Sequence, residues 1–143
     1  MLSDQDVIRI VRSHIEAQFP KSCARCKRRY ESLAEYLLGT THVGDPITGD
    51  DPLADPQPVK LIGTISYANC ACGSTLGISS AGMDILIMWR LLRWAGVNMT
   101  RRGISIGELL SDLRRRIDEE VLREHHAGVR HARDRVQGAS ARP

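Results

Sequence analysis

The four cysteines of this 143-residue chain form two close pairs. Cys23 and Cys26 have two residues between them, whereas Cys70 and Cys72 have one. Two thiolates at such a spacing can turn towards one point, and two such pairs supply the four sulfur ligands of a tetrahedral zinc site. In a reducing compartment, paired cysteines indicate a metal site more often than a disulfide. The spacing therefore predicts one closed, structural Zn²⁺ site made of these four residues.

Other interpretations of the cysteines stay open. Zinc-bound thiolates can respond to oxidants when cations lie nearby, and four cations surround the first pair: Arg25, Lys27, Arg28 and Arg29. An iron–sulfur cluster also takes four cysteine ligands, and four unligated buried thiols are a further option. His42 would become a ligand if one cysteine stayed outside the site.

The segments on either side of the second pair are rich in β-branched residues. Residues 60–67 and 74–80 are therefore predicted to be two strands, with Cys70 and Cys72 at the tip of a hairpin. Gly73 suits the left-handed backbone conformation that lets a chain turn around a sulfur atom. A metal clip at the tip of a hairpin resembles the zinc ribbons, and the resemblance covers residues 23–26 and 60–80. It implies that zinc joins the hairpin to the segment between the first two helices.

Hydrophobic spacing predicts four helices. The first begins at a capping box of Ser3 and Asp6 and ends before Pro20. The others are predicted at residues 30–39, 84–96 and 105–124, the last as a strongly amphipathic helix. Between the second helix and the hairpin, residues 40–59 contain four prolines and four aspartates without any period, so a long loop is expected there.

These elements predict one α+β domain over residues 1–125, in which about four helices pack around a small zinc-clipped, zinc-ribbon-like β-hairpin. A chain of 143 residues has the length of a single domain. The apolar period is lost from about His126, so residues 126–143 are predicted to be a disordered basic tail. Residues 123–143 hold five basic and two acidic residues and so carry the whole excess positive charge of the chain.

Charge and hydropathy exclude several classes of protein. The net charge is only +3, and the chain before the C-terminal tail is balanced, which argues against a nucleic-acid groove built into the fold. The longest apolar run, residues 85–89, is far shorter than the ~20 residues of a membrane span. No secretory signal is visible at the N-terminus. We therefore expect a cytoplasmic protein without membrane contact, and its preference for Arg over Lys indicates a bacterial source.

No catalytic motif accompanies the cysteines. The chain has no Gly-x-Ser-x-Gly, His-Glu-x-x-His or phosphate-loop sequence, and four thiolate ligands leave no coordination position for water. We expect a non-enzymatic regulatory or accessory protein that acts through contacts with a protein partner, using helix 105–124 or the helix that carries Trp89 and Trp94. The alternatives are a nucleic-acid-binding zinc protein, which would use the cations of the first pair and the tail, or a redox sensor.

Overall fold

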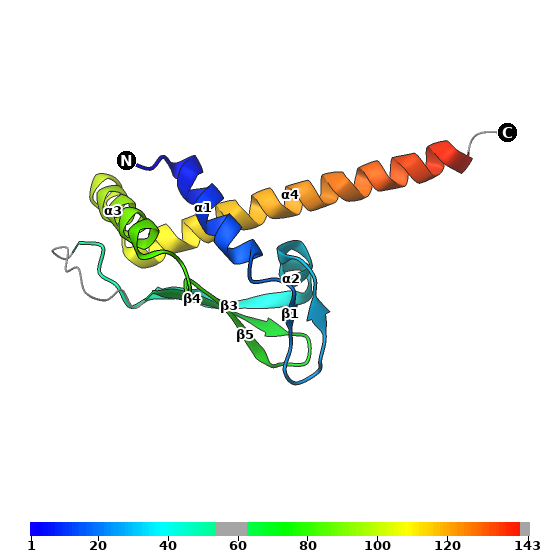
Figure 1. The fold of residues 1–143 in the computed structure, drawn as a ribbon, viewed down its shortest axis with the longest axis horizontal. Coiled ribbons are helices and arrows are strands. Elements are labelled where there is room, and N and C mark those ends of the chain that lie inside the picture. The colour runs from blue at the N-terminus through cyan, green and yellow to red at the C-terminus, as the bar shows by residue number, and fades with distance from the viewer. Residues whose placement is uncertain (54–62, 141–143) are drawn as a thin grey trace.

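A computed structural model of the protein describes residues 1–53 and 63–140 (Figure 1). The helices are α1 (Asp4–Glu16), α2 (Leu33–Gly39), α3 (Ile85–Arg102) and α4 (Ile106–Ser140). The strands are β1 (Lys21–Ser22), β2 (Arg29–Tyr30), β3 (Thr40–Thr48), β4 (Thr64–Cys70) and β5 (Thr75–Ser79). The chain is thus a mixed helix and sheet fold with two small antiparallel sheets, β1–β2 and β3–β4–β5.

Strand β3 corrects the prediction of a loop over residues 40–59. Its β-branched residues favour an extended chain, and β3 pairs along β4 from Thr40 opposite Cys70 to Thr48 opposite Thr64. The register breaks between Val43 and Ile47, where Gly44 has a φ of 66°. This break interrupts the alternation of a regular strand, which is why no period of two is visible in the sequence.

The predicted hairpin forms, with β4 and β5 as its strands. Strand β4 continues past residue 67 to Cys70, so the first cysteine of this pair ends a strand and Cys72 lies in the turn. Residues 60–62 of the predicted first strand lie outside the described part of the chain. The turn contains Gly73 at a φ of 91°, which confirms the left-handed conformation expected there.

Two helices, α1 and α4, start at the predicted caps. In α1 the Ser3 hydroxyl accepts from the Asp6 N–H, and the Asp6 carboxylate accepts from the Ser3 N–H. The Ser105 hydroxyl likewise accepts from the Glu108 N–H at the start of α4. Helix α3 continues six residues beyond the predicted end at residue 96 and stops at Gly103, whose φ of 64° closes the helix.

Helix α4 also corrects the prediction of a disordered tail. It continues to Ser140 and projects far beyond the other elements (Figure 1). Most residues after His126 are Arg, Ala and other helix-compatible types, and Gly128 and Gly138 are the main opposing positions. The apolar period is lost because residues 126–138 of this helix are exposed, so no face of it needs to be apolar.

The apolar faces of the helices form two buried clusters. One contains Ile117 and Val121 of α4 together with Cys23 and Cys70. The other contains Trp94 of α3, whose indole N–H donates to an Asp4 carboxylate oxygen at 3.1 Å. The apolar face of residues 105–124 and the Trp94 side chain are therefore core, and neither is a free surface.

Arg12 of α1 contacts three carboxylates, two of which belong to α4. Its guanidinium contacts Glu16 at 2.7 Å, Glu120 at 3.0 Å and Glu124. The hydrogen bond from Arg12 holds the pKa of Glu124 below its ordinary value of 4.5. The stabilisation by this pair is therefore complete above that ordinary pKa and is lost as the pH falls through the lowered folded-state pKa.

We expect Arg12→Met to lower the melting temperature by a few °C at pH 7, and by less as the pH is brought from 5 towards 3. Melting curves followed by circular dichroism at each pH measure the difference from wild type. Arg9→Met is the control, because Arg9 is exposed and its ion pair within residues 1–53 and 63–140 is with Asp6 of its own helix. A difference that stays constant across this pH range would contradict the role of the carboxylates.

Candidate metal centre

The first cysteine pair lies in the turn between β1 and β2. The Lys27 N–H donates to the Cys23 carbonyl and the Cys23 N–H donates to the Arg28 carbonyl, both at 2.9 Å. Lys27 has a φ of 67°, in the left-handed region where glycine is the usual residue. These two hydrogen bonds and the left-handed Lys27 form a tight turn, and this turn carries both Cys23 and Cys26.

The second pair lies in a turn built in a similar way. The Cys70 N–H donates to the Ser74 carbonyl and the Gly73 N–H donates to the Cys70 carbonyl, both at 2.8 Å. Because Cys70 ends β4, the three-stranded sheet fixes the position of this turn. Each cysteine pair thus lies in a turn that is closed by backbone hydrogen bonds.

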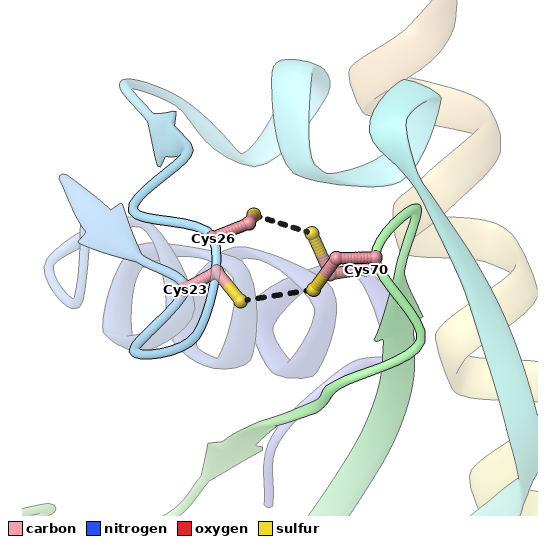
Figure 2. Close-up of side chains that lie close together, drawn as sticks. Cys23, Cys26 and Cys70 are labelled. Carbon is pink, nitrogen blue, oxygen red and sulfur yellow. Dashed lines mark hydrogen bonds between the residues drawn. The ribbon is translucent and has the colours of Figure 1, made fainter.

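The two turns face each other and bring the four sulfur atoms together (Figure 2). All four Sγ atoms lie within 4.8 Å of one another. Cys23 Sγ is 3.6 Å from Cys72 Sγ, and Cys26 Sγ is 3.7 Å from Cys70 Sγ. The sulfurs of a regular tetrahedron with ~2.3 Å metal–sulfur bonds lie ~3.8 Å apart. The four cysteines are free thiols, and their donor type and spacing fit a metal ion.

The cluster lies at the edge of the core. Cys23 and Cys70 are buried, Cys72 is half-buried and Cys26 is exposed. The buried pair packs in the same cluster as Ile117 and Val121 of α4. The sulfur atoms therefore join a solvent-facing turn to the packed interior, which is the position from which a bound ion can stabilise both.

Backbone amides favour the thiolate form of the buried cysteines. The N–H groups of Cys26 and Arg25 lower the pKa of Cys23 to about 6. The Tyr30 hydroxyl and the Cys72 N–H lower the pKa of Cys70. Hydrogen bonds to the charged form stabilise it, so these two sulfurs are prepared to act as anionic ligands.

Cys26 shows the opposite tendency. The Arg28 N–H favours its thiolate, but burial of the sulfur and the thiols of the three other cysteines raise the pKa of Cys26 to about 11. Four adjacent anions repel one another, and a divalent cation between them removes that repulsion. The cluster therefore has the electrostatics of a cation site.

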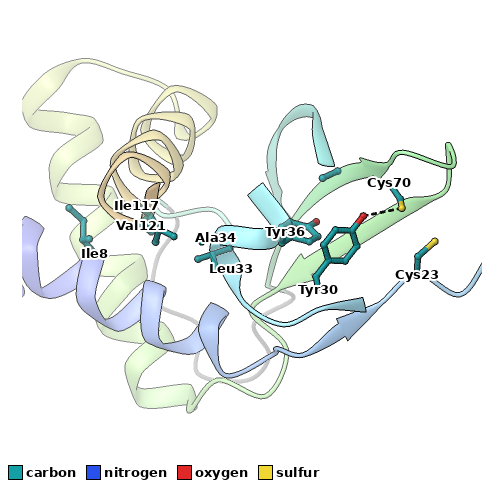
Figure 3. Packing of buried hydrophobic residues seen from close by; sticks show 10 residues of the cluster. Ile8, Cys23, Tyr30, Leu33, Ala34, Tyr36, Cys70, Ile117 and Val121 are labelled. Carbon is teal, nitrogen blue, oxygen red and sulfur yellow. Dashed lines mark hydrogen bonds between the residues drawn. The ribbon is translucent and has the colours of Figure 1, made fainter. Parts of the chain in front are cut away.

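Tyr30 is the residue at this site that the sequence did not reveal. Its hydroxyl lies 3.0 Å from Cys70 Sγ (Figure 3). A thiolate can only accept, so the phenol is the donor. The side chain is buried, and burial followed by the Cys70 hydrogen bond raises the pKa of Tyr30 to about 12. The predicted helix over residues 30–39 included Tyr30, whereas the structure places it in β2 and starts α2 at Leu33.

The other residues considered from the sequence lie outside the cluster. His42 is on β3, with Nε2 2.9 Å from a carboxylate oxygen of Asp118, and it is no member of the sulfur cluster. The four cations near the first pair are exposed. Among them, Arg29 pairs with Glu31, and the Arg28 guanidinium lies 5.0 Å from the centre of the Tyr30 ring.

Two further findings concern membrane-spanning helices and similarity to known proteins. Within residues 1–53 and 63–140, no helix combines the length and the apolar character that crossing a membrane requires; the cytoplasmic location stays a prediction. The chain was also compared with protein-family models, with curated proteins and with solved structures. None of these three comparisons finds a match to it.

Proposed function

We propose that this chain is a non-enzymatic protein in which Cys23, Cys26, Cys70 and Cys72 hold one structural Zn²⁺. The observation that carries the proposal is the convergence of four sulfurs from two distant turns within 4.8 Å. Four thiolates in tetrahedral spacing favour zinc among the common metals. An iron–sulfur cluster would hold the cysteine sulfurs farther apart, because several irons and sulfides would lie between them.

In this proposal zinc has a structural role. It joins the β1–β2 turn to the tip of the β4–β5 hairpin in a zinc-ribbon-like arrangement, with two short strands on each side of the ion. The four thiolates fill the coordination sphere, so no position is left for a substrate or an activated water. The ion would stabilise the sheet end of the fold, and the helices would carry the contacts with other molecules.

We further propose that the protein is a regulatory or accessory factor that binds a partner protein through the projecting part of α4. Residues 123–138 of α4 are mostly exposed. Val129 and Val136, which are 52% and 70% exposed, are seven residues apart and so lie on one face of the helix. Arg130 and Arg133 flank that face, which suits a partner with acidic side chains beside an apolar groove.

A second function, nucleic-acid binding, is favoured by the charge of the same helix end. It carries Arg123, Arg130, Arg133 and Arg135. Contacts with phosphates make affinity fall steeply with salt. Binding to duplex DNA or to RNA that weakens steeply with salt would favour this function over the protein partner, and no binding at low salt would remove it.

The metal assignment is tested by elemental mass spectrometry of the purified protein together with a thiol count. We expect one zinc per chain, with thiols that react slowly in the native state and four that react after unfolding. Iron would contradict the zinc assignment. A metal-free protein with reactive thiols would contradict the structural site and favour a redox function of the cysteines.

A further inference from the structure

A second site lies between the helices and the three-stranded sheet. A partly open cavity of about 200 Å³ is present there, with residues of all four helices on one side and of β3, β4 and β5 on the other. It is separate from the cysteine cluster, because none of the four cysteines lines it. The proposed zinc site does not involve this cavity.

The two walls of the cavity differ in chemistry. The helix wall is apolar and is formed by side chains such as Val11, Leu91, Leu92, Leu110 and Leu113. The sheet wall carries five hydroxyl side chains, which belong to Thr48, Thr64, Ser66, Ser79 and Ser80. An occupant must therefore present an apolar surface to one side and a hydrogen-bonding group to the other.

Two of the five hydroxyls are free to bind an occupant. Thr48 donates to the Gly63 carbonyl, and the hydroxyls of Ser79 and Ser80 accept from the N–H groups of Ala81 and Thr64. Within the described part of the chain, the side-chain hydroxyls of Thr64 and Ser66 make no hydrogen bond. Residues 64 and 66 are two apart on β4, so both face the same side of the sheet. A half-buried hydroxyl without a protein partner is a ready hydrogen-bond partner for a ligand.

The charged groups at the cavity already have partners. His42 contacts Asp118 at 2.9 Å, and Arg114 donates to the Gly44 carbonyl at 2.9 Å. Arg114 also lies 3.9 Å from an Asp45 carboxylate oxygen. No cation of the described lining is left to neutralise a phosphate or carboxylate, and burying an unpaired charge against leucine is costly. The lining therefore selects an uncharged occupant.

The volume limits the size of that occupant. An apolar cavity of ~150 Å³ is large enough to bind benzene, and the cavity of about 200 Å³ is somewhat larger. One ring or two fused rings fit such a space, whereas a nucleotide or a long acyl chain does not.

We propose that this cavity binds a small, uncharged aromatic molecule that carries one hydroxyl or N–H group. The ring lies against the leucines of α3 and α4, and the polar group bonds to the hydroxyls of Ser66 and Thr64. Phenol and indole have this chemistry and are the probes for the test.

The methionines of the chain provide the readout. Met83 and Met88 line the cavity, whereas Met1 is exposed and Met99 is buried outside the lining. Methyl-labelled methionine gives one NMR signal for each of the four residues. Titration with phenol or indole should shift the Met83 and Met88 signals to saturation and leave Met1 and Met99 in place. Benzoate should bind at least tenfold more weakly than phenol, because its charge would be buried without a partner.

Substitutions at Ser66 distinguish binding of the probes in the cavity from unspecific binding elsewhere on the protein. Ser66→Phe should fill the space and abolish the shifts, while Thr41→Phe, on the opposite face of the sheet, should leave them unchanged. Ser66→Ala should weaken phenol binding about tenfold and leave benzene binding unchanged, since only phenol uses the hydroxyl.

Absence of saturable shifts up to the solubility limit of both probes would overturn the proposal. Equal shifts of all four methionines, or unchanged phenol affinity in Ser66→Ala, would overturn it as well. Because the readout needs no zinc measurement, its result is independent of the metal assignment.

Discussion

A Cys70→Ala variant is expected to bind no zinc and to melt at least about 10 °C below the wild-type protein. Cys70 is 3% exposed and ends β4 inside the core cluster that also holds Cys23. With one ligand lost, three thiolates no longer complete the tetrahedral site, and without the ion their negative charges repel one another. Because metal binding contributes free energy of folding, ~10–16 kcal/mol in isolated zinc fingers, even a fraction of it gives a shift of this size.

The control for this experiment is the wild-type protein treated with a strong chelator. If the effect of Cys70→Ala comes from the lost ion, both samples should melt at the same temperature. Added zinc should then restore only the wild type. A variant that kept one zinc per chain and the wild-type melting temperature would show that Cys70 is no ligand.

A Tyr30→Phe variant is expected to bind zinc 10–100-fold more weakly, which is the usual cost of removing a partner of a metal ligand. The Tyr30 hydroxyl lies 3.0 Å from Cys70 Sγ and donates to the thiolate in a buried setting. Without it, the negative charge on that sulfur loses its nearest side-chain donor, and phenylalanine supplies none. Competition with a chromophoric chelator at fixed pH measures the change in affinity.

Tyr36→Phe is the matched control. Tyr36 is also buried, and its ring lies 5.7 Å from that of Tyr30. Among the described residues, its hydroxyl makes no hydrogen bond with a cysteine. Both substitutions remove one buried phenol oxygen, so only a difference between them reports on the thiolate. Equal zinc affinities in the two variants would mean that the Tyr30 hydroxyl has no effect on the site.

The sequence predicted those features that depend on local spacing. The capping box at Ser3 forms as expected, and the Ser105 hydroxyl caps the start of α4, because both contacts involve residues three positions apart. The β4–β5 hairpin and the left-handed Gly73 are local as well. The convergence of the two cysteine pairs could be predicted too, since four thiols at these spacings have few other uses in a reducing compartment.

Features that depend on distant contacts could not be predicted in the same way. Tyr30 and Cys70 are 40 residues apart, and nothing near Tyr30 in the sequence indicates a sulfur acceptor. Strand β3 exists because β4 lies beside it, and its register break removes the alternation that identifies a strand. The cavity is also invisible in the sequence, because its helix wall is formed by residues whose spacing looks like ordinary core.

Helix α4 is long enough to turn a small movement at its base into a larger displacement at its tip. Its 35 residues span ~50 Å at ~1.5 Å per residue. Leu110 and Leu113 at its base line the cavity, and Ile117 and Val121 farther along pack in the cluster that holds Cys23 and Cys70. The part of α4 beyond Glu124 is ~24 Å long, so a tilt of ~10° at the base moves the tip by ~4 Å. A small change of packing at the cavity or at the core cluster would thus produce a larger displacement at the C-terminal end of α4.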